Sequence, residues 1–458
     1  MPANTGRDLE FITPPREAIQ STIHELGEHD VDLVHLQFSD IAGGARAVTI
    51  PVSLLPRVFH RGYRFDGAAM AGGERQVEVD LFLMPDPSTL TIFPVVDGQP
   101  RRAQLFCWVT RRENQPFAGD PRTILQHQLQ RAAALDLDYR AGIELEFYLY
   151  RGGSLNEAAR AAHLVDNGYF GEGREDTALV RDEIIAELHE LGVGVHGAHH
   201  ETGPGQQELD LRHSGGIRIA DQLMTTRQVI RQVAQRHGMR ATFMAKPFPD
   251  LPGSGMHIFQ RMLSLSDGRD LLRDDNDPHG TSQLARHIIG GQLQHAPAMS
   301  AILNTTVNSY KRLADGHRAP AWATWARVSR GSLLRVPTSA SDVPIDLELR
   351  SPDALANPYL MVAVALGAAV DGIQNEIEPP PPFDENLVSW EEDEFHRFGA
   401  TRLPQTMGEA LDELASNDVM RSILGTYIFD QLLAVKRAEW ADYRRHVSPW
   451  EHERYGDL

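Results

Sequence analysis

The order of secondary-structure patterns constrains the fold of this chain most, because the pattern changes character at Pro121. Before that proline, alternating β-branched and apolar residues predict a hairpin that turns at Gly43 and Gly44, and further strands over residues 77–86 and 90–96. After it, helical periodicity alternates with strand patterns, which predicts a strand around Glu144 and helices over residues 122–135, 176–191 and 219–237. The sequence therefore predicts an α+β fold with a small β-rich domain first.

Chain length and apolar runs support this division and argue against a membrane span. A chain of 458 residues is long for one compact core, so a large domain and a smaller one are expected. The longest apolar run covers residues 360–370, which is too short to cross a bilayer and predicts a buried core helix. A proline run within residues 378–383 breaks any helix and separates the core from a helical C-terminal stretch.

Charge and cysteine content narrow the classes of partner. A formal net charge of -19 disfavours nucleic acid and anionic membranes, because both are bound through Lys and Arg. The single cysteine, Cys107, cannot form an intrachain disulfide or a zinc site by itself. Residues 1–11 lack the apolar stretch of a secretory signal. We therefore expect a cytoplasmic protein with small-molecule partners.

Acidic residues form the first group that could carry chemistry. Glu144 and Glu146 stand two residues apart in the β-prone segment GIELEFYLY, so both carboxylates should lie on one side of a sheet. An acidic pair on a solvent-facing strand is the alternative interpretation. Other segments provide further oxygen and nitrogen donors: Glu201, Glu208, His257 and Glu348. Carboxylates with one imidazole suit magnesium or manganese better than structural zinc, and their number predicts more than one metal ion.

Arginines form the second group. They lie between the acidic segments, at Arg312, Arg330, Arg335 and Arg350. Guanidinium groups bind carboxylates and phosphates through paired hydrogen bonds, so this interleaving predicts an anionic substrate and a transferred phosphoryl group. Surface ion pairs are the alternative for any one of them. The chain has no Walker, Rossmann or kinase motif, so a nucleotide would be held by metals, arginines and backbone.

The chain resembles bacterial type I glutamine synthetases from about Val31 to its C-terminus. The resemblance rests on the segments FSDIAGG, RFDGAAMAG, GIELEF, DNGYF, HHETGPGQQE, FMAKPFPDLPGSGMH, NTTVNSYKRL, ARVSRGSLLRVP and LELRSPDALANPYL. It implies an N-terminal β-grasp domain over residues 1–110 and a catalytic domain with a curved antiparallel sheet and helices over residues 111–458. It also implies ATP, two or three Mg²⁺ or Mn²⁺ ions per site, and a dodecamer of two hexameric rings with sites between neighbouring subunits.

Individual roles follow from the same resemblance. Glu146, Glu201 and Glu208 match the ligands of one metal ion, and Glu144, His257 and Glu348 match those of the second. Arg312 and Arg350 match arginines that orient glutamate, while Arg330 and Arg335 match those that contact the phosphates of ATP. Asp40 matches an aspartate that a neighbouring subunit contributes as general base near the amine, and Tyr169 matches a tyrosine of that pocket.

Three positions depart from the family pattern. Arg318 stands where the flap of glutamine synthetases carries a glutamate that helps to bind and deprotonate ammonium. A cation facing an ammonium pocket would repel that substrate, unless Arg318 points to solvent. Pro252 replaces the usual asparagine, and Phe259 replaces a second histidine, which puts one ATP contact in doubt. No segment near residue 398 resembles the tyrosine loop through which enterobacterial enzymes are adenylylated.

These departures favour an ATP-dependent ligase that joins glutamate to an organic primary amine through γ-glutamyl phosphate, in amine catabolism or detoxification. Arg318 would oppose the second charge of a polyamine, which favours monoamines slightly. The alternatives are a glutamine synthetase with an altered flap and a non-catalytic structural or regulatory relative. The complete set of carboxylates and His257 argues against the last of these.

Overall fold

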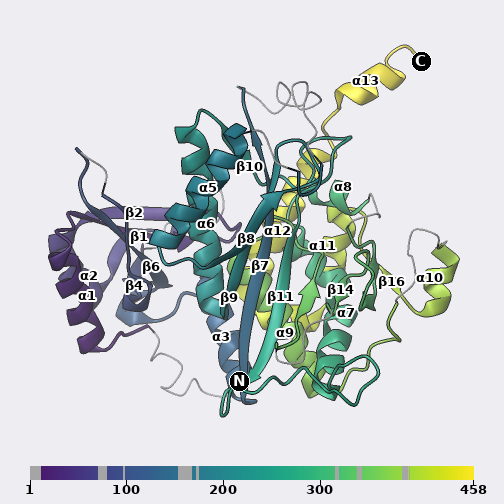
Figure 1. The fold of residues 1–458 in the computed structure, drawn as a ribbon, viewed down its shortest axis with the longest axis horizontal. Coiled ribbons are helices and arrows are strands. Elements are labelled where there is room, and N and C mark those ends of the chain that lie inside the picture. The colour runs from purple at the N-terminus through teal and green to yellow at the C-terminus, as the bar shows by residue number, and fades with distance from the viewer. Residues whose placement is uncertain are drawn as a thin grey trace.

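The protein is described here by a computed structural model that covers residues 12–70, 80–95, 98–152, 168–171, 175–314, 319–337, 343–383, 390 and 392–458. Figure 1 shows a small N-terminal part in purple and blue on the left, beside a larger part built around a central sheet. Strands and helices are mixed in both parts, so the expected α+β class is confirmed. Arg318 lies outside the described residues.

The N-terminal part packs two helices against a sheet. Its elements are α1 (Arg16–Glu28), β1 (Leu33–Ser39), β2 (Ala45–Pro51), α2 (Leu55–Arg61), β3 (Tyr63–Asp66), β4 (Asp80–Pro85), β5 (Thr91–Ile92) and β6 (Arg102–Thr110). The described strands run in the order β2-β1-β6-β4-β3, and β5 also pairs with β6. The predicted hairpin is β1 and β2, and Gly43 in its turn has a φ of 86°, which glycine adopts at little cost.

Sequence patterns did not predict helix α1. Its buried side chains Ile19, Thr22 and Leu26 recur at helical spacing, but polar residues between them weaken the signal. Together with α2 it covers an apolar cluster that includes Val34, Leu36 and Leu105 of the sheet. The small domain therefore has a core of its own.

The larger part contains the remaining elements. They are α3 (Pro121–Ala133), β7 (Leu137–Tyr150), α5 (Glu175–Glu190), β8 (Val195–His200), β9 (Gln206–Gly215), α6 (Gly216–Arg236), β10 (Arg240–Thr242), β11 (Met256–Ser264), α7 (Gln283–Leu303), α8 (Ser309–Leu313), β12 (Trp322–Ala323), β13 (Trp325–Ala326), β14 (Leu334–Arg335), β15 (Leu347–Leu349), α9 (Pro358–Gln374), α10 (Glu392–Phe398), β16 (Thr401–Arg402), α11 (Met407–Ala415), α12 (Asp418–Tyr443) and α13 (Pro449–Tyr455). The predicted helices near 122–135, 176–191 and 219–237 are confirmed as α3, α5 and α6.

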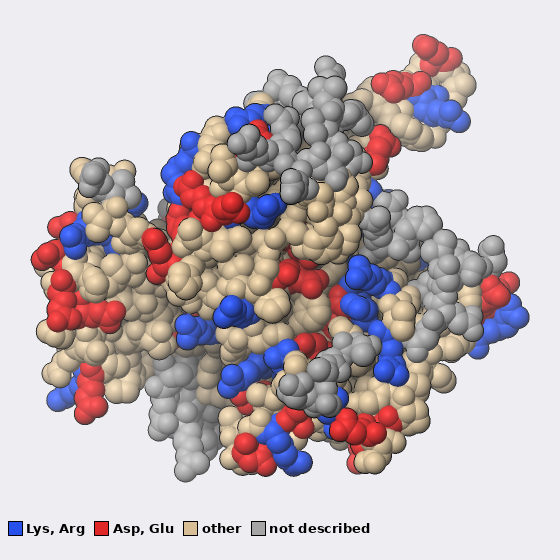
Figure 2. All heavy atoms as spheres, in the orientation of Figure 1, with Lys and Arg blue, Asp and Glu red and all other residues tan. Residues whose placement is uncertain are grey.

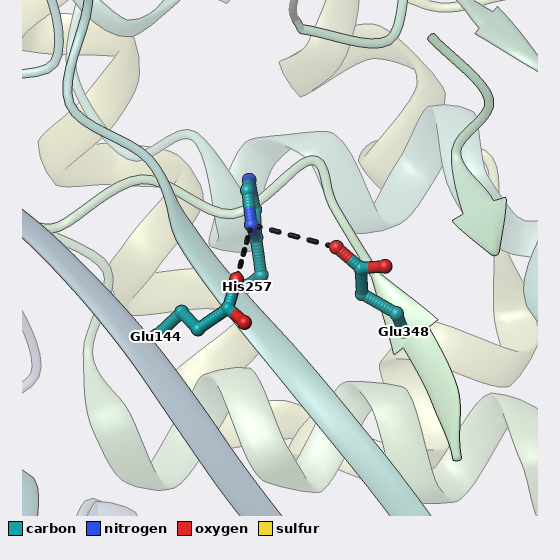
Figure 3. Close-up of side chains that lie close together, drawn as sticks. All are labelled: Glu144, His257 and Glu348. Atoms are coloured by element: carbon teal, nitrogen blue, oxygen red, sulfur yellow. Dashed lines mark hydrogen bonds and ion pairs between the residues drawn. The ribbon is translucent and has the colours of Figure 1, made fainter. Parts of the chain in front are cut away.

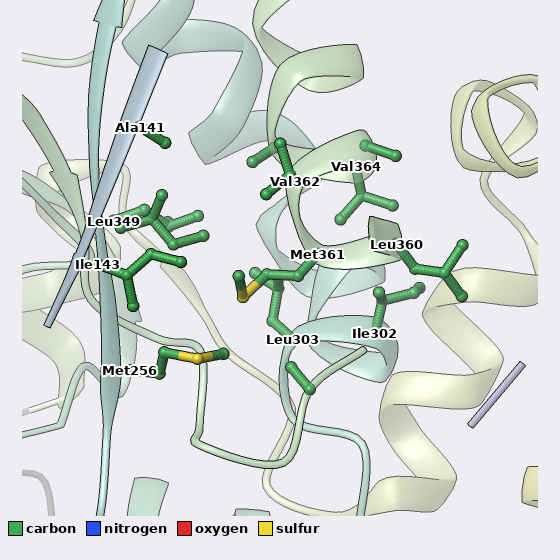
Figure 4. Packing of buried hydrophobic residues seen from close by; sticks show 14 of the residues in the cluster. Ala141, Ile143, Met256, Ile302, Leu303, Leu349, Leu360, Met361, Val362 and Val364 are labelled. Atoms are coloured by element: carbon green, nitrogen blue, oxygen red, sulfur yellow. The ribbon is translucent and has the colours of Figure 1, made fainter. Parts of the chain in front are cut away.

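The central sheet has a polar face and an apolar face. Its described strands run in the order β13-β14-β15-β11-β7-β9-β8, with antiparallel neighbours except for β13 and β14. Along β7, odd-numbered residues such as Ala141, Ile143 and Leu145 are buried in the main core. Figure 4 shows Ala141 and Ile143 facing Met361 and other apolar residues of the helices behind the sheet. Because side chains alternate along a strand, Glu144 and Glu146 lie on the opposite face.

Helices α7 and α9 form the layer behind the sheet. The predicted core helix is confirmed, because residues 358–370 of α9 are buried throughout. Glycines allow α7 and α9 to touch: a Cβ atom on Gly372 would lie 2.1 Å from the carbonyl oxygen of His287, and one on Gly291 would lie 2.3 Å from that of Ala368. Among the described residues, the helices are too short or too polar to cross a membrane.

One buried arginine joins the two parts. Arg122 on α3 donates two hydrogen bonds to Asp221 on α6, at 3.1 and 2.9 Å, and one at 2.9 Å to Asp86, which follows β4. Its guanidinium carbon also lies 3.8 Å from the centroid of the Trp108 ring on β6. The Tyr359 hydroxyl of α9 donates to Asp221 at 2.6 Å. The network therefore fixes the small sheet to three helices of the large part.

Candidate active site

The polar face of the central sheet forms the floor of a cavity of about 1220 Å³. In Figure 2, acidic side chains lie in a recess of the visible face and basic side chains surround it. Strand register brings the acids together: Glu144 of β7 is opposite His257 of β11 on one side and Asp210 of β9 on the other. Glu146 is opposite Glu208. Strands β7 and β9 thus contribute carboxylates to one patch, and β11 contributes an imidazole.

The first group of possible metal ligands is Glu144, His257 and Glu348, whose ligand atoms lie within 4.8 Å of one another. Figure 3 shows them converging from three neighbouring strands. The His257 Nδ1 atom lies 3.1 Å from an Oε atom of Glu144 and 3.6 Å from one of Glu348. Burial and the charge of Arg350 hold the pKa of His257 well below its usual value. The imidazole is therefore neutral, as a metal ligand must be.

The second group is His199, Glu201 and Glu208, again with ligand atoms within 4.8 Å. His199 of β8 is opposite Glu208 in register, and its Nε2 atom lies 3.2 Å from a Glu208 carboxylate oxygen. Sequence patterns indicated Glu201 and Glu208 but not His199. The two adjacent histidines before Glu201 could have suggested a further ligand, but only the register of β8 shows that His199 and not His200 is opposite Glu208.

Glu146 approaches this second group from β7 but is held by other partners. Its carboxylate accepts hydrogen bonds from the backbone N–H of Gly255, at 2.7 Å, and from the side-chain amide of Gln206, at 3.4 Å. Burial, and then the charge of Glu208, raise the pKa of Glu146 to about 7. Glu146 thus lies near enough to the expected partners Glu201 and Glu208 for their charges to affect its pKa, while His199 contacts Glu208 directly at 3.2 Å.

The carboxylates on the cavity floor are buried close together, so their charged forms are unfavourable unless cations bind between them. Burial is the main cause that raises the pKa of Glu144, Glu208 and Asp210 to about 7, and neighbouring carboxylates add to it. Carboxylate oxygens, which make up most of the donors on this floor, are the ligands that Mg²⁺ and Mn²⁺ prefer. The donor set therefore fits hard divalent cations. Asp210, like His199, was missing from the sequence-based set, although its spacing from Glu208 follows the period of two.

Arginines that the sequence places between the acidic segments line the same cavity: Arg312, Arg330, Arg335 and Arg350. Arg335 donates to Glu348 at 2.8 Å, and Arg350 donates to the other oxygen of the same carboxylate. Burial opposes the charge of Glu348, but these arginines lower its pKa, so it is ionised. Arg312 is buried and donates to the carbonyl oxygens of Ser351 at 2.8 Å and Arg350 at 3.2 Å.

Aromatic residues mark the outer part of the cavity. Tyr169 is 47% exposed and lines it together with Phe170 and Arg330. Partial burial raises the pKa of Tyr169, and a hydrogen bond with Arg330 lowers it by less, so the net shift is upward. The Phe170 ring lies over His199, with centroids 4.2 Å apart. Pro252 also lines the cavity, and its carbonyl oxygen accepts the Tyr148 hydroxyl at 2.8 Å.

The structure does not bring Asp40 to the cavity of its own chain. Asp40 lies in the turn between β1 and β2, is 1% exposed, and accepts hydrogen bonds from Arg46 at 3.0 Å and from the Gly44 N–H at 2.7 Å. Its carbonyl oxygen accepts from Asn357, the residue that caps α9. A contribution of Asp40 to another copy's cavity stays a prediction.

Each of the two parts of the chain matches a known protein-family model. Residues 30–112 match the model "Glutamine synthetase, beta-Grasp domain", and residues 118–455 match "Glutamine synthetase, catalytic domain". The fold and the acidic, arginine-lined cavity therefore define the class of ATP- and metal-dependent carbon–nitrogen ligases. Within that class, the chain belongs to the glutamine synthetase family.

Similar proteins cover nearly the whole chain. The glutamine synthetase of Halobacterium salinarum is 37% identical over 454 residues, 99% of each chain. That of Mycolicibacterium smegmatis is 36% identical over 442 residues, 95% of this chain and 98% of its own. A solved structure described as "Apo GmaS without ligand" has a TM-score of 0.83 at 30% identity, covering 95% and 99% of the two chains. Plasmodium falciparum glutamine synthetase shares the fold, with a TM-score of 0.85 at 21% identity.

Proposed function

We propose that this protein joins an organic amine to the γ-carboxylate of L-glutamate at the expense of ATP. The carboxylate is first phosphorylated to γ-glutamyl phosphate, and the amine then displaces phosphate to give a γ-glutamyl amide. The observation that carries the proposal is the likeness to GmaS, a γ-glutamylmethylamide synthetase, along 95% of the chain. Arg318 supports it, because a flap cation in place of a glutamate disfavours ammonium.

The residues of the cavity have distinct roles in this proposal. Glu144, His257 and Glu348 hold one cation, and Glu146, Glu201 and Glu208 hold the other. Bound divalent cations would neutralise the phosphoryl oxygens of ATP during transfer. Arg330 and Arg335 bind phosphate oxygens, and Arg312 and Arg350 bind glutamate. The present bonds of Arg335 and Arg350 to Glu348 compete with these contacts, so part of that ion pairing is exchanged when substrates bind.

Attack by the amine requires removal of a proton from nitrogen. We assign that step to Asp40 of a neighbouring copy of the chain, with Tyr169 forming part of the amine pocket. We further infer that copies assemble as two stacked hexameric rings, which would place the small domain of one copy beside the cavity of the next. Light scattering of the purified protein tests this assembly, and a monomer at micromolar concentration would contradict it.

Glutamine synthesis from ammonium is the second candidate. The named relatives from Halobacterium and Mycolicibacterium are glutamine synthetases, and they match along nearly the whole chain. The two candidates share ATP, glutamate, metals and γ-glutamyl phosphate, so they differ only in the nucleophile. Measuring which amine the enzyme uses therefore decides between them.

The deciding experiment measures phosphate release from ATP with glutamate and Mg²⁺ in the presence of one amine at a time. The panel contains ammonium, methylamine and longer alkylamines, ethanolamine, putrescine and spermine, and mass spectrometry identifies the product. A γ-glutamyl amide of an organic amine, with little glutamine, is expected. Dominant formation of glutamine would establish the second candidate instead, and comparison of methylamine with spermine separates monoamines from polyamines.

Restoring a carboxylate to the flap is expected to improve the use of ammonium. Arg318→Glu should raise kcat/KM for ammonium about tenfold, equivalent to roughly 1.4 kcal/mol of electrostatic interaction. Arg318→Gln is the matched control, because it removes the cation without adding a base. A gain with both variants would assign the effect to loss of repulsion alone. No gain with either would mean that Arg318 does not face the amine.

A further inference from the structure

Asp210 occupies a central place on the cavity floor that neither proposed set of metal ligands includes. It follows Glu208 by two residues on β9 and therefore shares its face of the sheet. Across the sheet it is opposite Glu144 of β7 on one side and Gly197 of β8 on the other. Asp210 thus neighbours Glu144 of the first group across the sheet and Glu208 of the second group along its own strand.

The carboxylate of Asp210 lies close to other carboxylates, and the charge of His199 offsets only part of the effect of burial and of Glu144 on its pKa. Ligand atoms of Glu144, Glu208 and Asp210 all lie within 4.8 Å of one another. The Oδ1 atom of Asp210 is enclosed and accepts no hydrogen bond from any residue that the structure describes. Within the same residues, Lys and Arg side chains form ion pairs with other acids of the floor but not with Asp210. Enclosed carboxylate oxygens without a donor are costly unless a cation or a proton lies between them.

The neighbouring strand leaves space for this carboxylate. A Cβ atom on Gly197 would lie 3.2 Å from the Oδ2 atom of Asp210, which is closer than nine in ten such contacts. Glycine at this position therefore lets the side chain of Asp210 lie against β8. Oxygens that share one ion lie up to about 4 to 5 Å apart, given metal–oxygen distances of roughly 2.0–2.6 Å. The three carboxylates meet that spacing.

We propose that Asp210 is a metal ligand, which together with Glu144 and Glu208 binds a divalent cation and so connects the two proposed metal positions. This inference rests on the proposed metal dependence of the cavity, but not on the identity of the amine. A proton shared between Asp210 and a neighbouring carboxylate is the competing way to relieve the repulsion. It would leave metal binding unchanged when Asp210 becomes an amide.

The test is Mn²⁺ binding to the full-length protein without ATP, glutamate or amine, measured by calorimetry and by the EPR signal of free Mn²⁺. Asp210→Asn keeps the size of the side chain but removes its charge. Compared with the unaltered protein, we expect this variant either to bind one Mn²⁺ ion fewer per chain or to bind one ion at least tenfold more weakly. A smaller change would overturn the proposal.

Two further variants separate coordination from charge and from folding. Asp250→Asn removes one negative charge from an exposed position on the rim of the same cavity, and its Mn²⁺ affinity should change less than threefold. An equal effect of both substitutions would overturn direct coordination by Asp210. Gly197→Ala retains the carboxylate but displaces it, and should weaken Mn²⁺ binding in the same direction. The metal-free Asp210→Asn protein should melt no lower than the parent, since it loses only a repelling charge.

The outcomes distinguish this inference from the proposed function. If the parent binds Mn²⁺ and Asp210→Asn binds it equally well, only the role of Asp210 fails. If the parent binds no Mn²⁺, the metal assignment of the whole cavity fails with it. Product analysis with the amine panel is independent of both results.

Discussion

Glu208→Ala is expected to reduce metal-dependent phosphate release from ATP by about three orders of magnitude or more. Glu208 lies where the acidic groups meet: it contacts His199, belongs to two of the possible ligand sets, and is opposite Glu146 in register. Loss of a metal that contributes several kcal/mol to charge neutralisation corresponds to roughly a thousandfold or more in rate. Coupled measurement of phosphate release with glutamate, Mg²⁺ and the best amine tests this.

The variant should remain folded and assembled, because Glu208 is opposed by like charges in the metal-free cavity. Glu190→Ala on the exposed end of α5 is the matched control, and it should keep the parent's rate. Calorimetric titration with Mn²⁺ should show weaker binding for Glu208→Ala only. Turnover within tenfold of the parent, in an intact oligomer, would refute the assignment of Glu208 as a metal ligand.

Local patterns predicted those parts of the fold whose signals lie within one segment. The hairpin around Gly43, the strand at Glu144 and the apolar helix α9 are confirmed for this reason. Helix α7 was not predicted, since Gly290, Gly291 and Pro297 usually interrupt helices. In the folded protein the glycines bring α7 against α9, so tertiary packing outweighs the local preference.

In the candidate site too, sequence patterns predicted only those features whose signal lies within one segment. Alternation along one strand placed Glu144 and Glu146 on a common face, and the structure confirms that both line the cavity. His199 and Asp210 escaped prediction because their positions depend on how β8 and β9 align with β7. The proposed role of Asp40 would depend on contacts between copies, which no pattern within a single chain specifies.

Arg122→Met is expected to lower the free energy of unfolding by about 3 to 5 kcal/mol, the usual cost of removing one partner from a buried ion pair. Arg122 is 2% exposed, and burial opposes its charge, but Asp221 and Asp86 raise its pKa above the usual value. Methionine keeps much of the apolar volume beside Trp108 yet removes the only guanidinium group that pairs with Asp221 and Asp86 among the described residues. Urea denaturation followed by tryptophan fluorescence measures the loss.

A matched pair of variants tests whether the effect comes from the unpaired carboxylates. Arg111→Met removes an exposed arginine that also lies over a ring, that of Phe117, and should change stability by no more than about 0.5 kcal/mol. Adding Asp221→Leu to Arg122→Met should recover part of the lost stability, because an apolar pair no longer buries a lone charge. The loss of unfolding free energy in the double variant is compared with the sum of the losses in Arg122→Met alone and Asp221→Leu alone. If the two are equal, the loss arises from packing between the two domains and not from the ion pair.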